Sequence, residues 1–579
     1  MTNVLAVLLF LVIAKCECAK ILAVFPSPSI SHQVVFRPLV HELARRGHDV
    51  TVITTDPAFP KGKTPQNLTE IDVHDISYNM WTNFLKTDKG NGDNFYAQLR
   101  FIFELMAEVF EEQMKTADVQ KLINDKKNKF DLLFIESCMR PALGFTYLYK
   151  IPVIAISSFG AIYETFDETG AVTNPLLYPG TFCQRIINLT LWEKSQELYA
   201  EFKGKYVYAD LTHSEDKMLQ NIFGSSIPSI TELRKNIQML FLNVHRIWDF
   251  NRPVPPNVVY LGGLHQNPAR QLPQELKSFL DSSKNGVIYM SFGTNVKPSL
   301  LPKEKVQIFT NVFSDLPYDV LWKWDKDEIP GRSKNVRISK WFPQSDLLKH
   351  PNLKLFITQG GLQSTDEALT AGVPLIGVPM LGDQWFNSEH YVKHNIGIKL
   401  NIETLTEAEL KEAIETIITN NSFRENVVKL GNTIRDQPLS PLERAVWWTE
   451  YVLRHKGASH LHPPAAHIHW TQYYAMDLVL FILVAFITLL LILTFVIRIV
   501  LSRLIDSSGD CLHCRHACLV PKVKLPRPTC ESGRFSTSLP LETSALLPRA
   551  PRAVRPGLKC HRRSRQCTIS ACHCSLYHS

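Results

Sequence analysis

The first sixty residues alternate between apolar runs and mixed segments in a way that predicts a parallel β-sheet. Residues 20–25 are apolar after one lysine, which is typical of a strand buried on both faces. Residues 38–46 carry apolar side chains at helical spacing, and Gly47 follows where such a helix would end. Residues 49–54 form a second apolar, β-branched run. Strand, helix and strand in this order predict a doubly wound α/β fold.

The pattern stops in a proline-rich stretch at residues 251–256 and then starts again, which indicates two α/β halves joined by a linker. We expect an N-terminal half over residues 20–250, a linker over residues 251–264 and a C-terminal half over residues 265–434. The other expected strands are residues 130–135, 152–157, 286–290, 320–324, 353–358 and 374–378.

A last helix of the body is expected at residues 440–456. Ser440 and Glu443 have the spacing of a capping box, and Gly457 suits the position that ends a helix. We therefore expect residues 435–476 to contain a helix that returns to the N-terminal half, followed by a membrane-proximal segment.

Two apolar segments predict a membrane topology. Residues 4–14 are too short to span a bilayer and are followed by small residues, as in a secretory signal peptide covering residues 1–19. Residues 478–497 are apolar apart from two threonines, and about 1.5 Å per residue carries them across a core of about 30 Å. Lys and Arg are absent just before this segment and frequent after it. The positive-inside rule then predicts a transmembrane helix at residues 477–501, with a lumenal body and a cytosolic tail.

Three Asn-x-Ser/Thr sequons agree with a lumenal body. They begin at Asn67, Asn188 and Asn420. In a lumenal domain such sequons are acceptors for N-glycosylation, although the motif also occurs by chance.

Composition and charge exclude several classes of protein. The 579 residues are 45% hydrophobic and 20% charged, which is the composition of a folded chain too long for one ordinary core. The net charge is +8, but residues 506–579 hold 12 of the 63 basic and 4 of the 55 acidic residues. The rest is formally neutral, so we expect no nucleic-acid partner. Only Cys138 and Cys183 lie in the body, so a disulfide framework is excluded there.

The tail at residues 502–579 is basic and contains eight of the twelve cysteines. Cys511, Cys514 and Cys518 have the spacing of half a zinc site, which residues 560–574 could complete. The simpler interpretation is a disordered basic tail.

The loop after the first strand contains a candidate general base. Open α/β sheets bind ligands beyond the carboxyl ends of their strands, and residues 26–32 follow such an end and finish in His32. Glu136 ends another strand and could orient the imidazole, which has a pKa suited to deprotonating a hydroxyl. Asp131 is the alternative partner, but it stands at the start of its strand. A lone histidine in a loop is otherwise most often a surface residue.

The C-terminal half contains a denser set of motifs. An aromatic ring can stack on a nucleobase, paired glycines let backbone N–H groups approach a diphosphate at a helix N-terminus, and a carboxylate can accept hydrogen bonds from a diol. The motifs are Ser291-Phe292-Gly293-Thr294, Trp341-Phe342-Pro343-Gln344, Gln359-Gly360-Gly361-Leu362-Gln363-Ser364, Glu367 and Asp383-Gln384.

In this order and spacing the motifs resemble the membrane-bound UDP-glycosyltransferases, most closely the insect and baculoviral branch. The resemblance covers residues 20–503 and includes Ser31-His32 near the start. It implies two Rossmann-like domains that face a cleft, the GT-B type of glycosyltransferase, followed by a single transmembrane helix. It also implies residence in the endoplasmic reticulum membrane as a single-pass type I protein, although no retention signal is evident.

The resemblance implies a role for each donor-site residue. Trp341 and Gln344 would contact uracil, and Glu367 would bind the ribose hydroxyls. Asp383 and Gln384 would hold the hydroxyls of the sugar. The residues expected at the diphosphate and beside it are Ser291, Gly293, Thr294, Gln359, Gly360, Gly361, Gln363 and Ser364.

Two positions depart from the family pattern. Gln359 stands where most relatives have a histidine, so it can donate a hydrogen bond to the diphosphate but cannot supply a positive charge. Glu136 stands where many relatives have an aspartate, and its extra methylene changes the position of the carboxylate.

The implied reaction is a direct displacement with inversion. His32 would deprotonate the acceptor hydroxyl, and Glu136 would stabilise the imidazolium. We expect no cofactor and no metal, because hydrogen-bond donors and a helix dipole would carry the leaving charge. Asp325-Lys326-Asp327 formally matches a metal motif of another glycosyltransferase fold but lies in a charged turn.

The leading hypothesis is an enzyme that transfers a hexose, glucose rather than glucuronate, from a UDP-sugar to a small lipophilic acceptor in detoxification or hormone conjugation. The alternative is a catalytically weakened binding protein on the same fold. A dinucleotide-dependent oxidoreductase is set aside, because neither half has Gly-x-Gly-x-x-Gly after its first strand. The expected partners are the donor, the acceptor and membrane lipid, and a homo-oligomer is left open.

Overall fold

The computed structural model describes residues 18–84, 86–87, 95–125 and 127–516. Residues 1–17 of the predicted signal peptide lie outside the described residues, and so does the predicted tail beyond residue 516. The described residues fall into two units, which meet between Leu483 and Val484 and are described separately.

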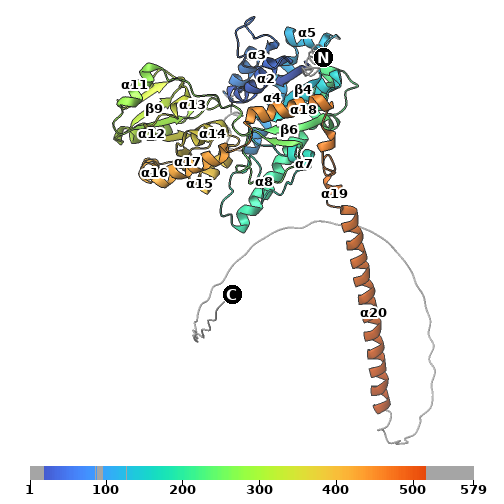
Figure 1. Cartoon of the computed structure of the whole chain (residues 1–579). Helices are drawn as coiled ribbons and strands as arrows, with labels where there is room; N and C mark the ends of the chain where they lie inside the picture. The colour runs from blue at the N-terminus through green and yellow to red at the C-terminus, as the bar shows by residue number, and fades with distance from the viewer. Residues whose placement is uncertain (1–17, 85, 88–94, 126, 517–579) are drawn as a thin grey trace, which may run out of the picture. The chain divides into compact units, whose positions relative to one another are not determined.

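The N-terminal half is built on one parallel sheet, shown mainly in blue and green in Figure 1. Among the described residues it has seven strands, in the order β3-β2-β1-β4-β5-β6-β7. Every pair is parallel, so each connection crosses over the sheet and places helices on its faces. The strands are β1 (Lys20–Phe25), β2 (Asp49–Thr54), β3 (Leu68–Asp72), β4 (Leu132–Glu136), β5 (Val153–Ser157), β6 (Ile237–Leu242) and β7 (Val258–Tyr260).

The helices of this half lie between those strands. They are α2 (Ile30–Arg45), α3 (His74–Phe84), α4 (Phe95–Met114), α5 (Ala117–Asn124), η1 (Arg140–Leu143), α6 (Gly144–Tyr149), α7 (Thr165–Thr169), α8 (Leu191–Asp210), α9 (Thr212–Phe223), α10 (Ile230–Leu233) and η2 (Arg234–Asn236).

The C-terminal half repeats the topology. Its parallel sheet has the order β10-β9-β8-β11-β12-β13, which matches the first six strands of the other sheet when each is numbered along its own half. The strands are β8 (Val287–Ser291), β9 (Asp319–Lys323), β10 (Val336–Ser339), β11 (Leu353–Thr358), β12 (Leu375–Gly377) and β13 (Gly397–Lys399). The helices are α11 (Gln274–Ser282), η3 (Pro298–Leu300), α12 (Lys303–Asp315), α13 (Gln344–Leu347), α14 (Leu362–Ala371), α15 (Gln384–Lys393), α16 (Glu407–Thr419) and α17 (Asn421–Arg435).

Burial on both faces of the sheets explains the apolar runs in the sequence. In β1, Leu22 and Val24 belong to one buried cluster, whereas Ile21, Ala23 and Phe25 belong to another. Neighbouring side chains in a strand point to opposite faces, so this division places a hydrophobic core on each side of the sheet. One of the clusters also contains Tyr289 and other residues of the C-terminal half, so the two halves share a continuous core.

The first helix differs from the prediction. It was expected over residues 38–46, but α2 begins at Ile30 and contains Pro38 in its interior. The expected loop over residues 26–32 is therefore wrong at its end, because His32 lies in the first turn of α2. Gly47 follows the helix with φ +100°, as its position predicted.

The predicted linker is also wrong in part. Residues 251–264 include β7 (Val258–Tyr260), which pairs with β6 at the edge of the N-terminal sheet. The prolines that indicated a linker precede the strand, where a missing N–H interrupts no sheet pairing.

The helix that follows the C-terminal half packs on the N-terminal half. α18 (Pro441–His455) starts with the predicted capping box, because Ser440 accepts from the N–H of Glu443 and the Glu443 carboxylate accepts in return. It ends at His455, one residue earlier than expected, and both Lys456 (φ +54°) and Gly457 (φ +132°) have positive φ just after it. Its buried residues join a cluster of the N-terminal sheet, and Figure 1 shows α18 in orange among blue and green elements.

Short helices η4 (Ser459–Leu461) and α19 (Trp470–Tyr473) lead from α18 to α20 (Met476–His516). Within α20, Met476–Ser507 is long and apolar enough to cross a membrane, judged by length and composition. The helix extends beyond the predicted boundary at residue 501 and includes the first residues of the predicted tail.

Candidate functional site

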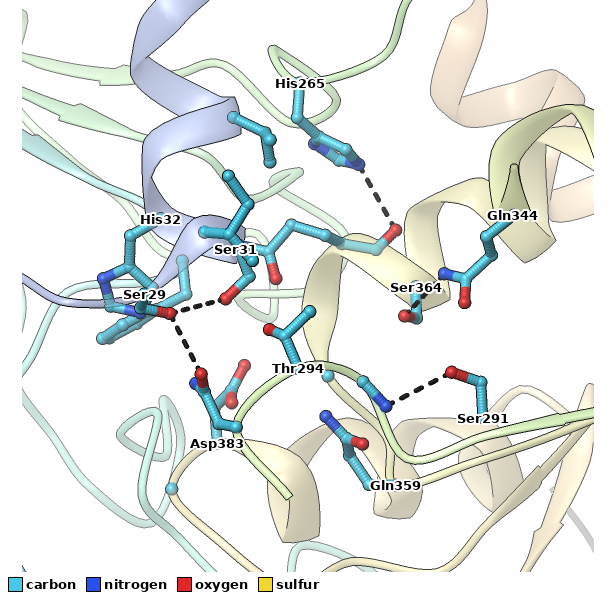
Figure 2. A pocket seen from close by; sticks show the side chains of 18 of the residues that line it. Ser29, Ser31, His32, His265, Ser291, Thr294, Gln344, Gln359, Ser364 and Asp383 are labelled. Atoms are coloured by element: carbon cyan, nitrogen blue, oxygen red, sulfur yellow. Dashed lines mark hydrogen bonds between the residues drawn. The ribbon is translucent and has the colours of Figure 1, made fainter. Parts of the chain in front are cut away.

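A pocket of about 540 Å³ is lined by both halves of the body. Its residues follow β1 and β4 of one sheet and β8, β9 and β11 of the other. In each sheet the strand order reverses between the first and fourth strands, and ligands of doubly wound sheets bind at this reversal. The fold therefore places the reversal points of both sheets at the same pocket (Figure 2).

His32 and Glu136 meet on the N-terminal side of the pocket. The first turn of α2 carries His32, and Glu136 is the last residue of β4. The His32 Nδ1 and the Glu136 Oε1 are hydrogen-bonded, with 20% of the His32 side chain and 1% of the Glu136 side chain exposed. Asp131, the alternative partner, instead accepts from the N–H of Lys20. The structure thus pairs His32 with the residue that the strand positions favoured.

Gln344, Ser364 and Glu367 form a hydrogen-bonded group on the opposite side of the pocket. The Gln344 Nε2 donates to the Ser364 Oγ at 2.9 Å and to the Glu367 Oε2 at 2.7 Å. The Gln344 Oε1 accepts from the Tyr289 hydroxyl at 3.1 Å. Burial raises the pKa of the Glu367 carboxyl to about 7, although the bond from Gln344 acts in the other direction. Its buried neighbour Asp366 has a pKa raised to about 8, again mainly by burial.

Two glycine-containing loops approach each other closely around Gln359. Gly293 has φ +72°, and a Cβ on it would lie 2.2 Å from the Gln359 Nε2. Gly360 has φ +91°, and a Cβ there would lie 2.6 Å from the Ser388 Oγ. Glycine is therefore required at both positions. Gly361 is the N-cap of α14, so backbone N–H groups at this helix end face the pocket region.

Gln359 itself is nearly buried, with 8% of its surface exposed. Its Oε1 is buried and has no hydrogen-bond partner among the described residues. Ser291, at the end of β8, accepts from the N–H of Gly293 through its hydroxyl at 3.3 Å. Thr294 lines the same pocket and lies centrally in Figure 2.

Asp383 and Gln384 lie at the start of α15. Burial raises the pKa of the Asp383 carboxyl to about 6, against the hydrogen bond from Asn387 and the charge of nearby His32. The Gln384 Oε1 accepts from the N–H groups of Met380 and Leu381, both at 2.8 Å. Because that oxygen is already hydrogen-bonded to the loop before α15, only the side-chain N–H groups of Gln384 can bind a ligand. Figure 2 shows Asp383 at the end of the pocket that also holds His32.

Trp341 is 62% exposed at the rim of the pocket, and the Lys323 Nζ lies 4.9 Å from its ring centre. Lys323 was not predicted as a site residue. It is the last residue of β9, its Nζ donates to the carbonyl of Gly293 at 2.6 Å, and burial lowers its pKa to about 8. The rule that ligands bind at the carboxyl ends of strands would have identified it.

Gln363 connects the two halves. Its Nε2 donates to the carbonyl of Ser158 in the N-terminal half at 2.9 Å, and its own carbonyl accepts from the His265 Nε2 at 3.3 Å. His265 was also missed by the sequence; burial lowers its pKa to about 4, so the ring is neutral. The Gln363 side chain is thus engaged in an interdomain contact, although the residue lines the pocket.

The N-terminal wall of the pocket is mainly apolar. Phe159 packs edge-on against the His32 ring with centroids 5.7 Å apart. Cys138 lies on the same wall, and burial raises the pKa of its thiol well above the usual value. The other apolar lining residues on this side are Ile30, Val34, Trp81, Leu99, Ile102, Phe103, Met106, Ile162 and Phe182.

The three predicted glycosylation sites lie on the surface. Asn67, Asn188 and Asn420 are all exposed. Asp325 accepts hydrogen bonds from Ser299, so the Asp-Lys-Asp turn is used locally. Among residues 18–84, 86–87, 95–125 and 127–516, no group of three or more His, Cys, Asp and Glu residues could hold a metal ion.

Two Rossmann-like domains with a ligand pocket between them define the fold of GT-B glycosyltransferases. The solved calicheamicin glycosyltransferase CalG4 is similar in fold, with a TM-score of 0.51 at 18% identity over 75% of this chain and 98% of that chain. At this identity the similarity concerns the fold alone.

The chain belongs to the UDP-glucoronosyl and UDP-glucosyl transferase family, whose model matches residues 19–510. It is 37% identical over 491 residues to an ecdysteroid UDP-glucosyltransferase of Spodoptera littoralis nuclear polyhedrosis virus, covering 81% of this chain and 95% of the relative. It is 34% identical to UDP-glucosyltransferase 2 of Dactylopius coccus, covering 85% and 95%. The protein is therefore a UDP-hexosyltransferase.

Proposed function

We propose that the protein transfers glucose from UDP-glucose to a hydroxyl group of a lipophilic acceptor of about steroid size, with inversion at the anomeric carbon. The observation that carries the proposal is the pairing of buried Glu136 with His32 beside Asp383, opposite the Gln344 group, in one pocket. This arrangement separates a base at one end from a nucleotide-sized polar surface at the other.

The donor occupies the C-terminal side in this proposal. Uracil stacks on exposed Trp341, and Glu367 accepts hydrogen bonds from the ribose diol. The diphosphate lies at the N-terminus of α14, beside Gln359 and Ser364. The Lys323 Nζ donates a hydrogen bond to the carbonyl of Gly293, in the loop that contacts Gln359. Lys323 thereby supplies a positive charge that Gln359 lacks.

Near the sugar, Asp383 and the N–H groups of Gln384 bind its hydroxyls. The hydrogen bonds that the Gln384 Oε1 accepts from Met380 and Leu381 fix this side chain before the donor binds. This lowers the entropic cost of binding.

The chemical step uses the His32–Glu136 pair. The His32 Nε2 takes the proton of the acceptor hydroxyl as its oxygen attacks the anomeric carbon and the bond to the diphosphate breaks. Glu136 holds the Nδ1 and stabilises the imidazolium that forms. The leaving charge stays on UDP, where N–H groups and Lys323 stabilise it.

The acceptor lies against the apolar wall formed by α4 and the segments after β1 and β5. A wall of this kind favours ligands with a rigid apolar body and a few hydroxyl groups. The similarity to ecdysteroid UDP-glucosyltransferases makes a hydroxylated steroid our first choice of acceptor.

We further propose that Met476–Ser507 spans the endoplasmic reticulum membrane and that the body is lumenal. The length of the segment, its apolar composition and the basic residues after residue 497 support this topology. The exposed sequons at Asn67 and Asn420 agree with a lumenal body.

The test is UDP release by the full-length protein in detergent micelles with an ecdysteroid, other steroids and simple phenols. UDP-glucose, UDP-glucuronate and UDP-galactose are compared, with His32→Ala as the control. We expect turnover with UDP-glucose and a hydroxylated steroid that is lost in the variant. Binding of UDP-glucose without turnover would favour the weakened binding protein, and turnover with UDP-glucuronate alone would overturn the choice of sugar.

A further inference from the structure

The side chain of Asn387 contacts two parts of the donor site. Asn387 lies on the first turn of α15 and is buried, with 1% of its surface exposed. Its Nδ2 donates to the Asp383 Oδ2 and to the carbonyl of Gly360, both at 2.8 Å. Asp383 is the residue proposed to bind the sugar hydroxyls, and Gly360 precedes the helix end proposed for the diphosphate. One amide group therefore holds both of these segments.

The third hydrogen bond of this amide comes from the N-terminal half. The Asn387 Oδ1 accepts from the Trp248 Nε1 at 2.8 Å, and Trp248 follows β6 with 2% of its surface exposed. An indole nitrogen can only donate and a backbone carbonyl can only accept, so Trp248 and Gly360 together determine which way the amide points. Its oxygen faces the N-terminal half, and both of its N–H groups face the donor site. The orientation of Asn387 thus depends on contact between the halves.

The ring of Trp248 is enclosed on several sides. It stacks on His390 with ring centroids 4.5 Å apart and on His394 with ring centroids 5.8 Å apart. The next residue in the chain, Asp249, forms an ion pair with Arg252 at 3.0 Å. A buried ring between such neighbours has little freedom to turn, so its N–H group is a donor in a fixed position.

The two histidines of this stack take no part in the hydrogen bonds to Asn387. Both ring nitrogens of His390 and the Nε2 of His394 are buried without a hydrogen-bond partner among the described residues. Burial lowers the pKa of both rings, that of His390 well below its usual value, so both are neutral. His390 contributes packing alone, which makes it a suitable control for this cluster.

The three hydrogen bonds of Asn387 depend on each other. A buried donor or acceptor that loses its partner is costly, so loss of the bond from Trp248 would favour rotation of the amide. Rotation would turn the Asn387 oxygen toward the Asp383 carboxylate and the Gly360 carbonyl, and both would then lose a donor. The Asp383 carboxylate would shift from the position in which it meets the sugar, and displacements of about 1 Å can matter at a reacting centre.

We propose that Asn387 is a positioning residue of the donor site and that Trp248 orients it from the N-terminal half. The sugar-binding carboxylate is then in place only when the two halves are in contact. The inference rests on the proposed role of Asp383 at the sugar. Because UDP carries no sugar, its affinity should depend little on Trp248, whereas the affinity for UDP-glucose should depend on it.

The test compares UDP-glucose with UDP in calorimetric titrations of the full-length protein in detergent micelles without acceptor. Trp248→Phe removes the N–H donor and keeps an aromatic ring, whereas His390→Phe changes the neighbouring ring and removes no hydrogen bond. We expect Trp248→Phe to weaken UDP-glucose binding about threefold to tenfold, as for the loss of one hydrogen bond. Its UDP affinity, and both affinities of His390→Phe, should stay within about twofold. Equal losses for the two ligands, or equal losses in the two variants, would overturn the proposal.

A double-mutant cycle with Asp383→Ala separates positioning from a general effect on the fold. Alone, Asp383→Ala should weaken UDP-glucose binding about tenfold or more, because it removes a charged acceptor. In that background Trp248→Phe should weaken binding further by less than about twofold, since the group through which it acts is gone. Independent losses from the two substitutions would overturn the proposal.

Asn387→Asp is a second variant that keeps the shape of the side chain and removes its N–H groups. We expect it to weaken UDP-glucose binding about tenfold or more, because a carboxylate would then face the Asp383 carboxylate and the Gly360 carbonyl. Binding of UDP-glucose at the wild-type affinity would exclude a positioning role for Asn387.

The same titrations distinguish failure of this inference from failure of the proposed function. A loss of UDP-glucose affinity in Asp383→Ala without a loss in Trp248→Phe would overturn this inference alone. An affinity that Asp383→Ala leaves unchanged would overturn the proposed sugar contact, and this inference with it.

Discussion

The two halves of the body have the same strand order but opposite kinds of ligand surface. At its reversal point the N-terminal sheet presents the His32–Glu136 pair and three serines, Ser27, Ser29 and Ser31, beside an apolar wall. The C-terminal sheet presents amides, hydroxyls and carboxylates that bond to each other, as in the Gln344 group. A shared topology thus places both surfaces, and the loops after the strands decide whether each suits a lipophile or a nucleotide.

The two halves also differ in the surroundings of their buried carboxyl groups. Glu136 is paired with an imidazole, whereas burial raises the pKa of Glu367 to about 7 and that of Asp383 to about 6, and both of these carboxyl groups belong to residues that line the pocket. Buried acids of this kind are costly in the free protein and gain partners when hydroxyl groups of a ligand arrive. The C-terminal site is therefore built for a polar ligand before that ligand binds.

The largest expected effect separates chemistry in one half from binding in the other. His32→Ala should lower kcat by about 10²–10⁴-fold, because it removes the general base. UDP-glucose affinity should stay within about twofold, since the donor surface belongs to the C-terminal half. Steady-state UDP release and calorimetric titration with UDP-glucose in the absence of acceptor measure the two quantities. A variant that keeps wild-type kcat would exclude His32 as the base.

The next effect concerns the donor alone. Trp341→Ala should weaken UDP binding by about 1–3 kcal/mol, the usual contribution of base stacking on an aromatic ring. Trp447→Ala is a matched control, because Trp447 is 46% exposed but lies on α18. Titration with UDP measures both variants. Equal affinities for the two would show that Trp341 does not stack on the base.

A smaller effect depends on pH. With a pKa of about 7, Glu367 gains charge as pH rises from 6 to 8, so the KM for UDP-glucose should fall by up to about tenfold. Glu367→Gln should flatten this profile. The stability of the free protein changes in the opposite direction. A carboxyl whose pKa in the folded state lies above the usual 4.5 stabilises the fold in its protonated form, so this stabilisation is lost as pH rises through 7. A KM profile that is the same in the variant would contradict the ribose contact.

The smallest expected effect tests the departure from the family pattern. Gln359→His should tighten UDP-glucose binding about twofold to fivefold at pH 6, through a charge-assisted hydrogen bond. The gain is limited because Lys323 already carries a charge behind the Gly293 loop. Donor KM at pH 6 and pH 8 measures it. Weaker binding at both values would indicate that a ring does not fit beside Gly293.

Local patterns predicted the elements well where one interaction dominates. β1 has the predicted bounds because its run of five apolar residues is buried on both faces of the sheet. β2 also has the predicted bounds, with Val50, Val52 and Ile53 buried. The capping box of α18 is present because its two bonds join residues three apart. The start of α2 was missed because Pro38 resembles a helix start, while the packing of the first turn on the sheet extends the helix to Ile30.

The residues of the candidate site also differ in how well the sequence predicted them. The donor motifs were evident in the sequence because they are short segments after the carboxyl ends of β8, β10, β11 and β12. Lys323 and His265 belong to no motif. Lys323 could still have been identified from its place at the end of β9, whereas His265 acquires its role only through a contact with another segment.

By itself, the sequence determined the two α/β halves, which follow from the periodicity of apolar residues. Its motifs also pointed to the family by resemblance, and that resemblance predicted the donor residues. Only the tertiary structure decided that Glu136 rather than Asp131 meets His32 across 104 residues. It also decided that Gln344 joins Ser364 and Glu367. These contacts depend on how strands and helices distant in the chain pack together, which spacing along one segment does not encode.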